Sequence, residues 1–198
     1  MTEGMTMKKP IRQHLQAGFT LVELLIVVII LAILAAIVIP QFSSSTTDAK
    51  ESALDANLAA MRNGIELYRV QHTNGIFPGA VATSAGAACG APAAKGTGAA
   101  NSAQAWIDSF IQYSDAAGNT CTIGDAVVYK FGPYMRKKVP ADPITGKGSV
   151  PADIVVTTTG VPIAPAAATG GWATDTKSGQ VVMNSNALDS KGLAYSTH

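Results

Sequence analysis

Glu23 is the residue whose position in the sequence most clearly indicates a chemical role. It lies in residues 19–39, FTLVELLIVVIILAILAAIVI, where only Thr20 and Glu23 interrupt the apolar run. A carboxylate in such a segment disfavours membrane insertion by roughly 2.5–3.5 kcal/mol, so it is a functional candidate by default. As a helix the run would span about 31 Å, close to the hydrocarbon core of a bilayer. We therefore expect a membrane-spanning helix with an acid inside it.

Histidines and glycines elsewhere form no catalytic or phosphate-binding pattern. The three histidines, His14, His72 and His198, are scattered along the chain, which does not fit a catalytic triad or a multi-histidine zinc site. We interpret His72 as a residue at a helix end that packs on the domain. The G-x-G pairs at 96–98 and 146–148 lie in loop sequence and follow no strand, so they are a weak signal for phosphate binding.

The charge and aromatic content argue against a highly charged binding partner. The formal net charge is +1, charged residues make up 14% and aromatics 6% of the 198 residues, so no bulk field attracts nucleic acid or an acidic substrate. The basic cluster Arg136, Lys137 and Lys138 is interpreted as a solvated turn or a subunit contact, with nucleic-acid binding as the alternative. Trp106 and Trp172 are expected in the core or a hairpin rather than as stacking platforms.

The charges on either side of the apolar run indicate its orientation. Basic residues precede the run and mixed charges follow it: Lys8, Lys9 and Arg12, then Asp48, Lys50 and Glu51. The positive-inside rule places residues 1–18 in the cytoplasm and the bulk of the chain outside. If that outside is an oxidising periplasm, Cys89 and Cys121 can pair, whereas two free thiols are the alternative. The disulfide would close a loop of about 30 residues and contribute roughly 3 kcal/mol.

A secretory signal peptide does not fit the same segment. Such peptides have an apolar core of about 7–15 residues followed by small residues at a cleavage site. Here the run is longer and is followed directly by Pro40, while the small residue Gly18 precedes it. A cut after Gly18 would remove only the basic leader, residues 1–18, and leave the apolar helix on the mature protein.

Residues 17–42, AGFTLVELLIVVIILAILAAIVIPQF, resemble the N-terminal segment of type IV pilins and type II secretion pseudopilins. The resemblance implies that a prepilin peptidase cuts between Gly18 and Phe19 on the cytoplasmic face and then N-methylates Phe19. Glu23 matches the glutamate at the family's fifth mature position, and Pro40 matches its helix-kinking proline. The leader can start at Met1 or at Met7.

Elementary electrostatics supports this role for Glu23. After cleavage the amine of Phe19 is a cation at a helix N-terminus, where the macrodipole favours a carboxylate. Glu23 therefore complements its own helix and can reach the Phe19 amine of a neighbouring subunit. Two unit charges 4 Å apart interact by about 4 kcal/mol at an effective dielectric of 20, before desolvation is subtracted. The alternative is a glutamate that only extends to the membrane interface.

The periodicity predicts one long helix from about residue 19 to about residue 73. Its lipid-embedded half is residues 19–40, a kink is expected at Pro40, and residues 41–74 form an amphipathic periplasmic half. Asn74-Gly75 supplies the stop. One apolar face recurs at helical spacing: Leu54, Leu58, Met61, Ile65, Tyr68 and His72.

Residues 75–198 are predicted to form a small globular head, which gives an α+β fold of the pilin-like kind. Residues 76–102 are Ala/Gly-rich and are interpreted as a surface loop held by Cys89. A short helix carrying Trp106 and Phe110 is expected to end near Gly118. Strands are expected at 126–131, 154–158, 171–174 and 180–184, with a hairpin turn at 175–179. An antiparallel sheet against the amphipathic helix is the economical arrangement.

Two segments of the head extend the resemblance. Residues 131–146, FGPYMRKKVPADPITG, and residues 170–184, GGWATDTKSGQVVMN, resemble segments of major pseudopilin-like proteins. Those proteins also carry an Asp-rich, calcium-binding loop near the C-terminus. The tail here, residues 185–198, has Asp189 as its only acid. We therefore predict no cofactor; calcium is an alternative that the tail does not support.

The sequence favours a structural subunit in a bacterial cytoplasmic membrane, with a single-pass helix, a cytoplasmic N-terminus and a periplasmic head. The resemblance implies a helical homo-oligomer and, as partners, the prepilin peptidase, an assembly platform and its ATPase. A pseudopilus of a type II secretion-like system is preferred over a surface type IV pilus. One alternative is a tethered adhesin or DNA-uptake subunit that uses the Ala/Gly loop or the basic cluster. An anchored enzyme is not expected, because no catalytic constellation stands in the sequence.

Overall fold

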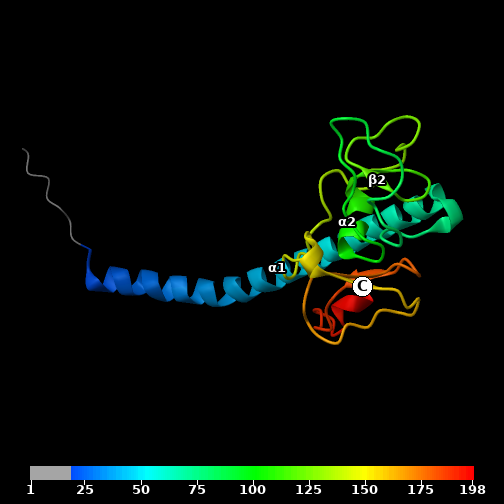
Figure 1. Ribbon diagram of the computed structural model, residues 1–198. Helices are drawn as coiled ribbons and strands as arrows, with labels where there is room; N and C mark the ends of the chain where they lie inside the picture. The colour runs from blue at the N-terminus through cyan, green and yellow to red at the C-terminus, as the bar shows by residue number, and fades with distance from the viewer. Residues whose placement is uncertain (1–18) are drawn as a thin grey trace, which may run out of the picture. The chain divides into compact units, whose positions relative to one another are not determined.

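The computed structural model describes residues 19–198, so the leader, Gly18 and His14 lie outside the described part of the chain. The chain divides into two compact units, one ending at Ser44 and one comprising Ser45–His198. Figure 1 shows the helices and strands of each unit along the chain. We call the second unit the head.

The long helix α1 comprises Leu21–Gln71, 51 residues, and includes Pro40. The predicted helix from about 19 to about 73 is therefore confirmed, and residues 43–48 are helical although Ser and Thr are poor helix formers. The kink at Pro40 stays a prediction. After α1, the short 3-10 helix η1 (Thr73–Gly75) contains Asn74 at φ 59°. The helix itself ends at Gln71, because His72 is extended with φ −105° and ψ 151°, and the predicted stop Asn74-Gly75 follows a few residues later in η1.

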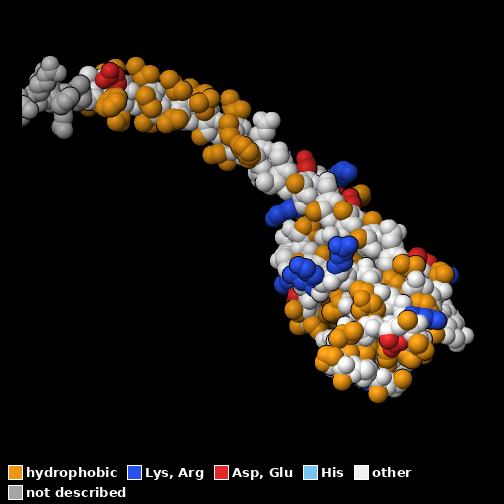
Figure 2. All heavy atoms as spheres, turned by 90° about the horizontal axis from the view of Figure 1, so that it is seen from above, with side chains coloured by type: hydrophobic (Ala, Val, Ile, Leu, Met, Phe, Trp, Pro, Cys, Tyr) orange, Lys and Arg blue, Asp and Glu red, His pale blue; other side chains and the backbone are white. Residues whose placement is uncertain are grey.

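In the first unit the side chains of the apolar run are all exposed. Residues 21–39 of α1 present aliphatic groups on every side, and Figure 2 shows apolar side chains along this segment, with one acidic side chain near its start. A helix that is apolar all round is stable only in lipid or among other helices. The sequence of this unit thus dictates a non-aqueous environment.

The core of the head forms between α1, the helix α2 (Ala103–Ile111) and one sheet. The predicted apolar stripe of α1 is buried, and Trp106 and Phe110 of α2 pack edge-to-face, with ring centroids 4.7 Å apart. Trp172 and Met183 complete this core from the sheet. A Cβ on Gly64 would lie 2.9 Å from Cε1 of Phe110, so only glycine lets α2 approach α1 this closely. The buried positions of Trp106 and Trp172 confirm their prediction as core residues.

The head holds two small sheets. The strands β1 (Tyr113–Ser114) and β2 (Thr120–Cys121) pair antiparallel. The second sheet has the order β3-β4-β5, with β3 (Ile154–Thr157), β4 (Trp172–Asp175) and β5 (Val181–Met183). The hairpin between β4 and β5 and its turn are confirmed, but β3 runs parallel to β4, with Ile154 opposite Trp172. The predicted antiparallel pairing thus holds for the hairpin, whereas β3 makes this sheet a mixed one, since residues 158–171 carry the chain back to the start of the sheet before β4 begins. Two further 3-10 turns are η2 (Pro151–Asp153) and η3 (Tyr195–Thr197).

Two predicted elements differ from the structure. Residues 126–131 are not a strand, because the Asp125 carboxylate accepts hydrogen bonds from the backbone N–H groups of Val127 and Val128 and folds the segment into a turn. Only Phe131 makes a β-bridge there, to Ser114. The second helix ends at Ile111 rather than near Gly118, because the chain becomes extended at Gln112 and enters β1.

The Ala/Gly-rich segment 76–102 is irregular, as predicted, but part of it is buried. Thr83, Gly96 and Gly98 are buried, and Asp108 of α2 accepts hydrogen bonds from Thr83 Oγ1 and the backbone N–H of Gly98. A Cβ on Gly98 would lie 2.1 Å from the backbone nitrogen of Ala105. The segment is therefore a surface loop only between residues 84 and 95.

Candidate functional site

Thr20 and Glu23 together cap the N-terminus of α1. The backbone N–H of Thr20 donates to Glu23 Oε2 at 2.9 Å, and the backbone N–H of Glu23 donates to Thr20 Oγ1 at 3.2 Å. The Thr20 hydroxyl also donates to Glu23 Oε2 at 2.8 Å. This reciprocal pair is a capping box, which satisfies two of the N–H groups that a helix leaves unpaired. The spacing Thr-x-x-Glu is its sequence signal, and the prediction for Glu23 alone missed the role of Thr20.

The capping geometry leaves Glu23 able to bind a cation as well. An ionised carboxylate offers about four acceptor positions on two oxygens, and the capping bonds engage only Oε2. Phe19 directly precedes the capped turn and is exposed, so both residues lie at the same end of the helix. The site therefore combines a fixed carboxylate with an open flank, on a helix whose neighbouring surface is wholly apolar.

The helix that carries this site is long enough for a bilayer. Within residues 19–198, α1 is the one helix whose length and apolar composition fit a membrane crossing. Length and composition together indicate a membrane-anchored protein.

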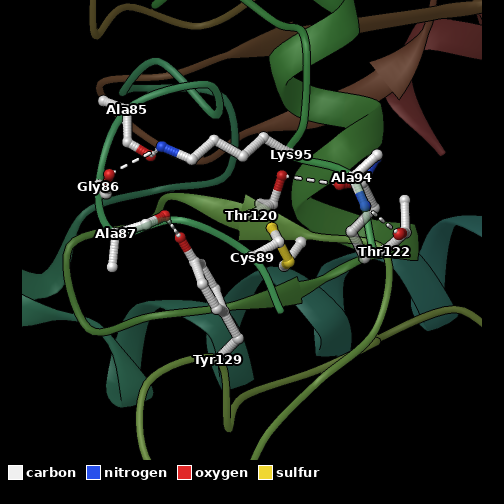
Figure 3. Close-up of a disulfide and its surroundings, with 11 residues drawn as sticks. Ala85, Gly86, Ala87, Cys89, Ala94, Lys95, Thr120, Thr122 and Tyr129 are labelled. Carbon is white, nitrogen blue, oxygen red and sulfur yellow. Dashed lines mark hydrogen bonds between the residues drawn. A yellow bond between two sulfur atoms is a disulfide. The ribbon is translucent and has the colours of Figure 1, made fainter. Parts of the chain in front are cut away.

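A disulfide fixes the exposed loop of the head. Cys89 and Cys121 are bonded, with Cα atoms 6.1 Å apart, and no free cysteine is found among the described residues. Around this bond, Lys95 Nζ donates to the carbonyl oxygens of Ala85 and Gly86, and the Tyr129 hydroxyl donates to that of Ala87 (Figure 3). The loop is thus held at several points, although it has almost no regular structure.

The C-terminal tail, residues 185–198, is attached to α1 by polar contacts that the sequence did not predict. Glu51 accepts hydrogen bonds from the backbone N–H and the hydroxyl of Ser190, at 2.8 and 2.6 Å. His198 lies between two carboxylates: Nδ1 is 2.7 Å from Asp55 Oδ1 and Nε2 is 3.1 Å from Asp189 Oδ2. A hollow of about 310 Å³ lies beside these groups and is lined by Asp48, Glu51, Ser52, Asp55, Ser190, Lys191 and His198. No sequence motif signals this cluster, because its members are about 140 residues apart.

The buried polar residues of the head hold loops in place. Asp175 accepts hydrogen bonds from the N–H groups of Gly160 and Ser178 and from the hydroxyl of Thr157. Burial raises the pKa of Asp175, but these hydrogen bonds outweigh burial and keep that pKa well below the usual aspartate range. Asp108 and Asp142 bind backbone N–H groups in the same way. These are structural carboxylates of turns.

His72 packs at the end of α1, as predicted. Its ring stacks on Tyr68 with centroids 3.6 Å apart, and Nε2 lies 3.0 Å from the Ser114 hydroxyl. Burial lowers the pKa of His72. Arg136, Lys137 and Lys138 are exposed, which suits both the solvated-turn and the contact interpretation. Within residues 19–198 no group of three or more His, Cys, Asp or Glu side chains has a metal-binding arrangement.

Comparisons with known proteins point to one family. Residues 13–39 match the family model of the prokaryotic N-terminal methylation motif. The type II secretion system core protein G of Pseudomonas aeruginosa is 36% identical over 62 residues, which cover 31% of this chain and 44% of that protein. The type IV narrow pilus major component PilA5 of Thermus thermophilus is 41% identical over 54 residues, 27% of this chain and 47% of that protein.

A third relative comes from another system. The competence protein ComGC of Halalkalibacterium halodurans is 35% identical over 66 residues, 33% of this chain and 63% of that protein. The chain thus spans about half the length of the curated relatives it matches. No solved structure matches the chain significantly. These matches identify the chain as a relative of type IV pilins and type II secretion pseudopilins that carries a prepilin-type N-terminal methylation motif.

Proposed function

We propose that this protein is a structural subunit of a helical filament that assembles from the bacterial cytoplasmic membrane. The observation that carries the proposal is a methylation motif at residues 13–39, placed on an apolar helix whose surface is exposed on all sides. Such a surface must exchange lipid for other helices when the subunit leaves the membrane. A filament core of packed α1 helices supplies that environment.

Processing creates the charge that assembly uses. A prepilin peptidase removes the leader between Gly18 and Phe19 and methylates the new amine, which stays a cation. Glu23 of one subunit then pairs with the Phe19 amine of the next, and this pair sets the register between adjacent helices. The capping box supports the mechanism because Thr20 holds the carboxylate at the helix end. In an apolar surrounding an unpaired charge is strongly unfavourable, so helices out of register are rejected.

Topology follows from the basic leader. The N-terminus faces the cytoplasm, α1 crosses the membrane once, and the head lies in the periplasm, where the disulfide between Cys89 and Cys121 forms. The partners are further copies of this chain, the prepilin peptidase, and an assembly platform with its ATPase. The role is structural rather than enzymatic and requires no cofactor or nucleic acid.

The matched relatives are a type II secretion protein, a type IV pilus component and a competence protein, and we propose a type II secretion-like pseudopilus first. The likeness of residues 131–146 and 170–184 to major pseudopilins supports it, and one matched relative is a core protein of such a system. The match to a type IV pilus major component favours a surface pilus as the second candidate. Deletion of the gene separates them: loss of a secreted cargo supports the first, and loss of surface fibres with normal secretion supports the second.

Variants at the capping box test the charge pairing. Glutamine at position 23 can still cap Thr20 but carries no charge, whereas Thr20→Ala weakens the cap and keeps the charge. We expect Glu23→Gln and Glu23→Ala to be processed and inserted normally but to lower the yield of sheared filaments or secreted cargo by at least about tenfold. Thr20→Ala should assemble nearly as well as the parent. Normal assembly of Glu23→Gln would show that the carboxylate only caps the helix.

The processing step has its own test. Gly18→Leu should leave the leader uncut, which appears as a persistent heavier band on an immunoblot and as the unprocessed intact mass. The parent protein in a strain without prepilin peptidase is the control and should give the same band. A mature N-terminus that begins after Pro40 would instead establish secretory cleavage and overturn the proposal.

A further inference from the structure

His198 makes a contact that depends on its protonation state. Its ring lies between Asp55 of α1 and Asp189 of the tail, with one nitrogen directed at an oxygen of each carboxylate, at 2.7 and 3.1 Å. A neutral imidazole has one N–H and one lone pair, whereas the imidazolium has two N–H groups. Both contacts are hydrogen bonds only when the ring is charged, because a lone pair facing a carboxylate is repulsive. The observed geometry therefore fits the protonated form.

The carboxylates on both sides of the ring differ in their surroundings. Asp189 is almost wholly buried, and its Oδ1 accepts hydrogen bonds from the N–H groups of Lys191 and Leu193. The Leu193 bond above all lowers the pKa of Asp189, with burial opposing it. The side chain of Asp55 is 61% exposed and offers its Oδ1 to Nδ1 of the His198 ring.

The surroundings of the ring add further charges. From α1, Asp48 and Glu51 line the same hollow, and the Arg62 guanidinium donates to the His198 carbonyl oxygen at 2.7 Å. From the tail, Lys191 lines the hollow, and the Tyr195 ring centroid lies 5.8 Å from that of His198. Arg62 and the pair Glu51–Ser190 anchor the tail without a proton, so they keep the tail near α1 when the imidazole is neutral.

We propose that His198 is a proton-operated latch that fastens the C-terminal tail to α1. When the imidazole is protonated it bridges Asp55 and Asp189 and closes the tail over the hollow. Loss of the proton removes one of the two hydrogen bonds, and the last turn of the tail, η3, loosens. The latch therefore closes when the imidazole gains a proton and opens when it loses that proton.

The consequence of opening is local and specific. The last turn of the tail loosens, so the exposed Asp55 and the buried Asp189 lose the cation that lies between them. The latch belongs to the head alone and does not depend on filament formation. It gives a periplasmic or surface-exposed head a response to the pH of the medium.

The test uses the full chain in detergent micelles, labelled with nitrogen-15 at histidine and at backbone amides. The ring nitrogens of His198 report charged or neutral imidazole, and a His198→Gln spectrum assigns them. Between pH 5.5 and 8.5 we expect the protection factors of the Tyr195, Ser196 and Thr197 amides to fall by about tenfold, the size expected when one charge-assisted hydrogen bond is lost. This loss should have the same midpoint as the His198 ring signal. The amides of Asp175 and Asn184, which bond within the sheet region, are internal references.

Variants separate the latch from general loosening. His198→Gln does not titrate, so its tail protection should be independent of pH over this range, and Asp55→Asn should weaken the pH dependence by removing one of the charged acceptors. Glu66→Gln, which removes an α1 carboxylate that pairs only with Arg69 at the surface, is the matched control and should behave as the parent. Equal tail protection at both pH values in the parent, or pH dependence that survives in His198→Gln, would overturn the proposal.

Discussion

Glu51 in the middle of α1 accepts two hydrogen bonds from Ser190, a residue 139 positions later in the chain. The Tyr195 hydroxyl lies 3.4 Å from the same carboxylate. Glu51 is only 7% exposed because it lies three residues before Leu54, in register with the buried face of α1. The contact joins the long helix to the tail and explains why a charged residue is tolerated inside the head.

The contact between Glu51 and Ser190 should weaken at acidic pH. The Ser190 hydroxyl and then the Ser190 N–H lower the pKa of Glu51, against the opposing effects of burial and Asp189. A lowered folded-state pKa contributes stability above the unfolded pKa, and this contribution is lost as the pH falls through the folded one. We therefore expect the Ser190 amide signal to shift only below a pH of about 4.3. Glu51→Gln should abolish this transition and loosen the tail at neutral pH. A Ser190 amide signal that does not change at acidic pH would contradict the contact.

Removal of the disulfide should destabilise the head without unfolding it. Opening a closed loop of about 30 residues lowers the free energy of unfolding by about 3 kcal/mol in the chain-entropy model. A Cys89→Ser/Cys121→Ser variant and the reduced parent should therefore melt at the same lowered temperature, measured by circular dichroism in detergent. Hydrogen exchange should increase mainly in residues 84–95, since Lys95 and Tyr129 still bind the loop backbone. Equal melting of the oxidised and reduced parent would contradict this.

Gly64 should tolerate no side chain, although it lies inside a helix. A side chain there would restore helix propensity by about 1 kcal/mol, but its Cβ alone would lie 2.9 Å from Cε1 of Phe110, so the Phe110 ring must shift. We expect Gly64→Val to lower the free energy of unfolding by about 1–3 kcal/mol through overpacking. Ala60→Val, at an exposed site of the same helix, is the matched control for β-branching. A Gly64→Val head as stable as this control would show that α2 moves freely away from α1.

Replacing Asp175 with asparagine should destabilise the head. Its Oδ1 accepts from the N–H groups of Lys177 and Ser178, while Oδ2 accepts from those of Thr159 and Gly160. An asparagine must direct its NH₂ group at one of these donor pairs, so we expect Asp175→Asn to lower the free energy of unfolding by at least about 2 kcal/mol. Chemical denaturation monitored by tryptophan fluorescence measures this, because Trp172 begins the same strand. Asp48→Asn on the exposed face of α1 should have little effect.

The local sequence determined the long helix α1, its buried face and its ends. Residues 19–39 had to form an apolar helix, and the spacing from Leu54 to His72 placed one face of α1 in the core. Asn74-Gly75 marked the end of that helix to within a few residues, and the Thr-x-x-Glu spacing at residues 20–23 already encoded its cap. Each of these features depends on residues within about four positions of one another. Local sequence patterns therefore predict them.

Only the tertiary structure decided which distant segments meet. The composition of residues 126–131 favours a strand, but the Asp125 side chain competed for the backbone and made a turn. The parallel pairing of β3 with β4 required the intervening loop to return along the sheet, which strand propensity does not encode. Glu51 meets Ser190, and His198 meets Asp55, because the folded head brings the tail back to α1. Hydrogen bonds and charge pairs form at contact distance, and contact distance between remote residues is set by the packing of the whole core.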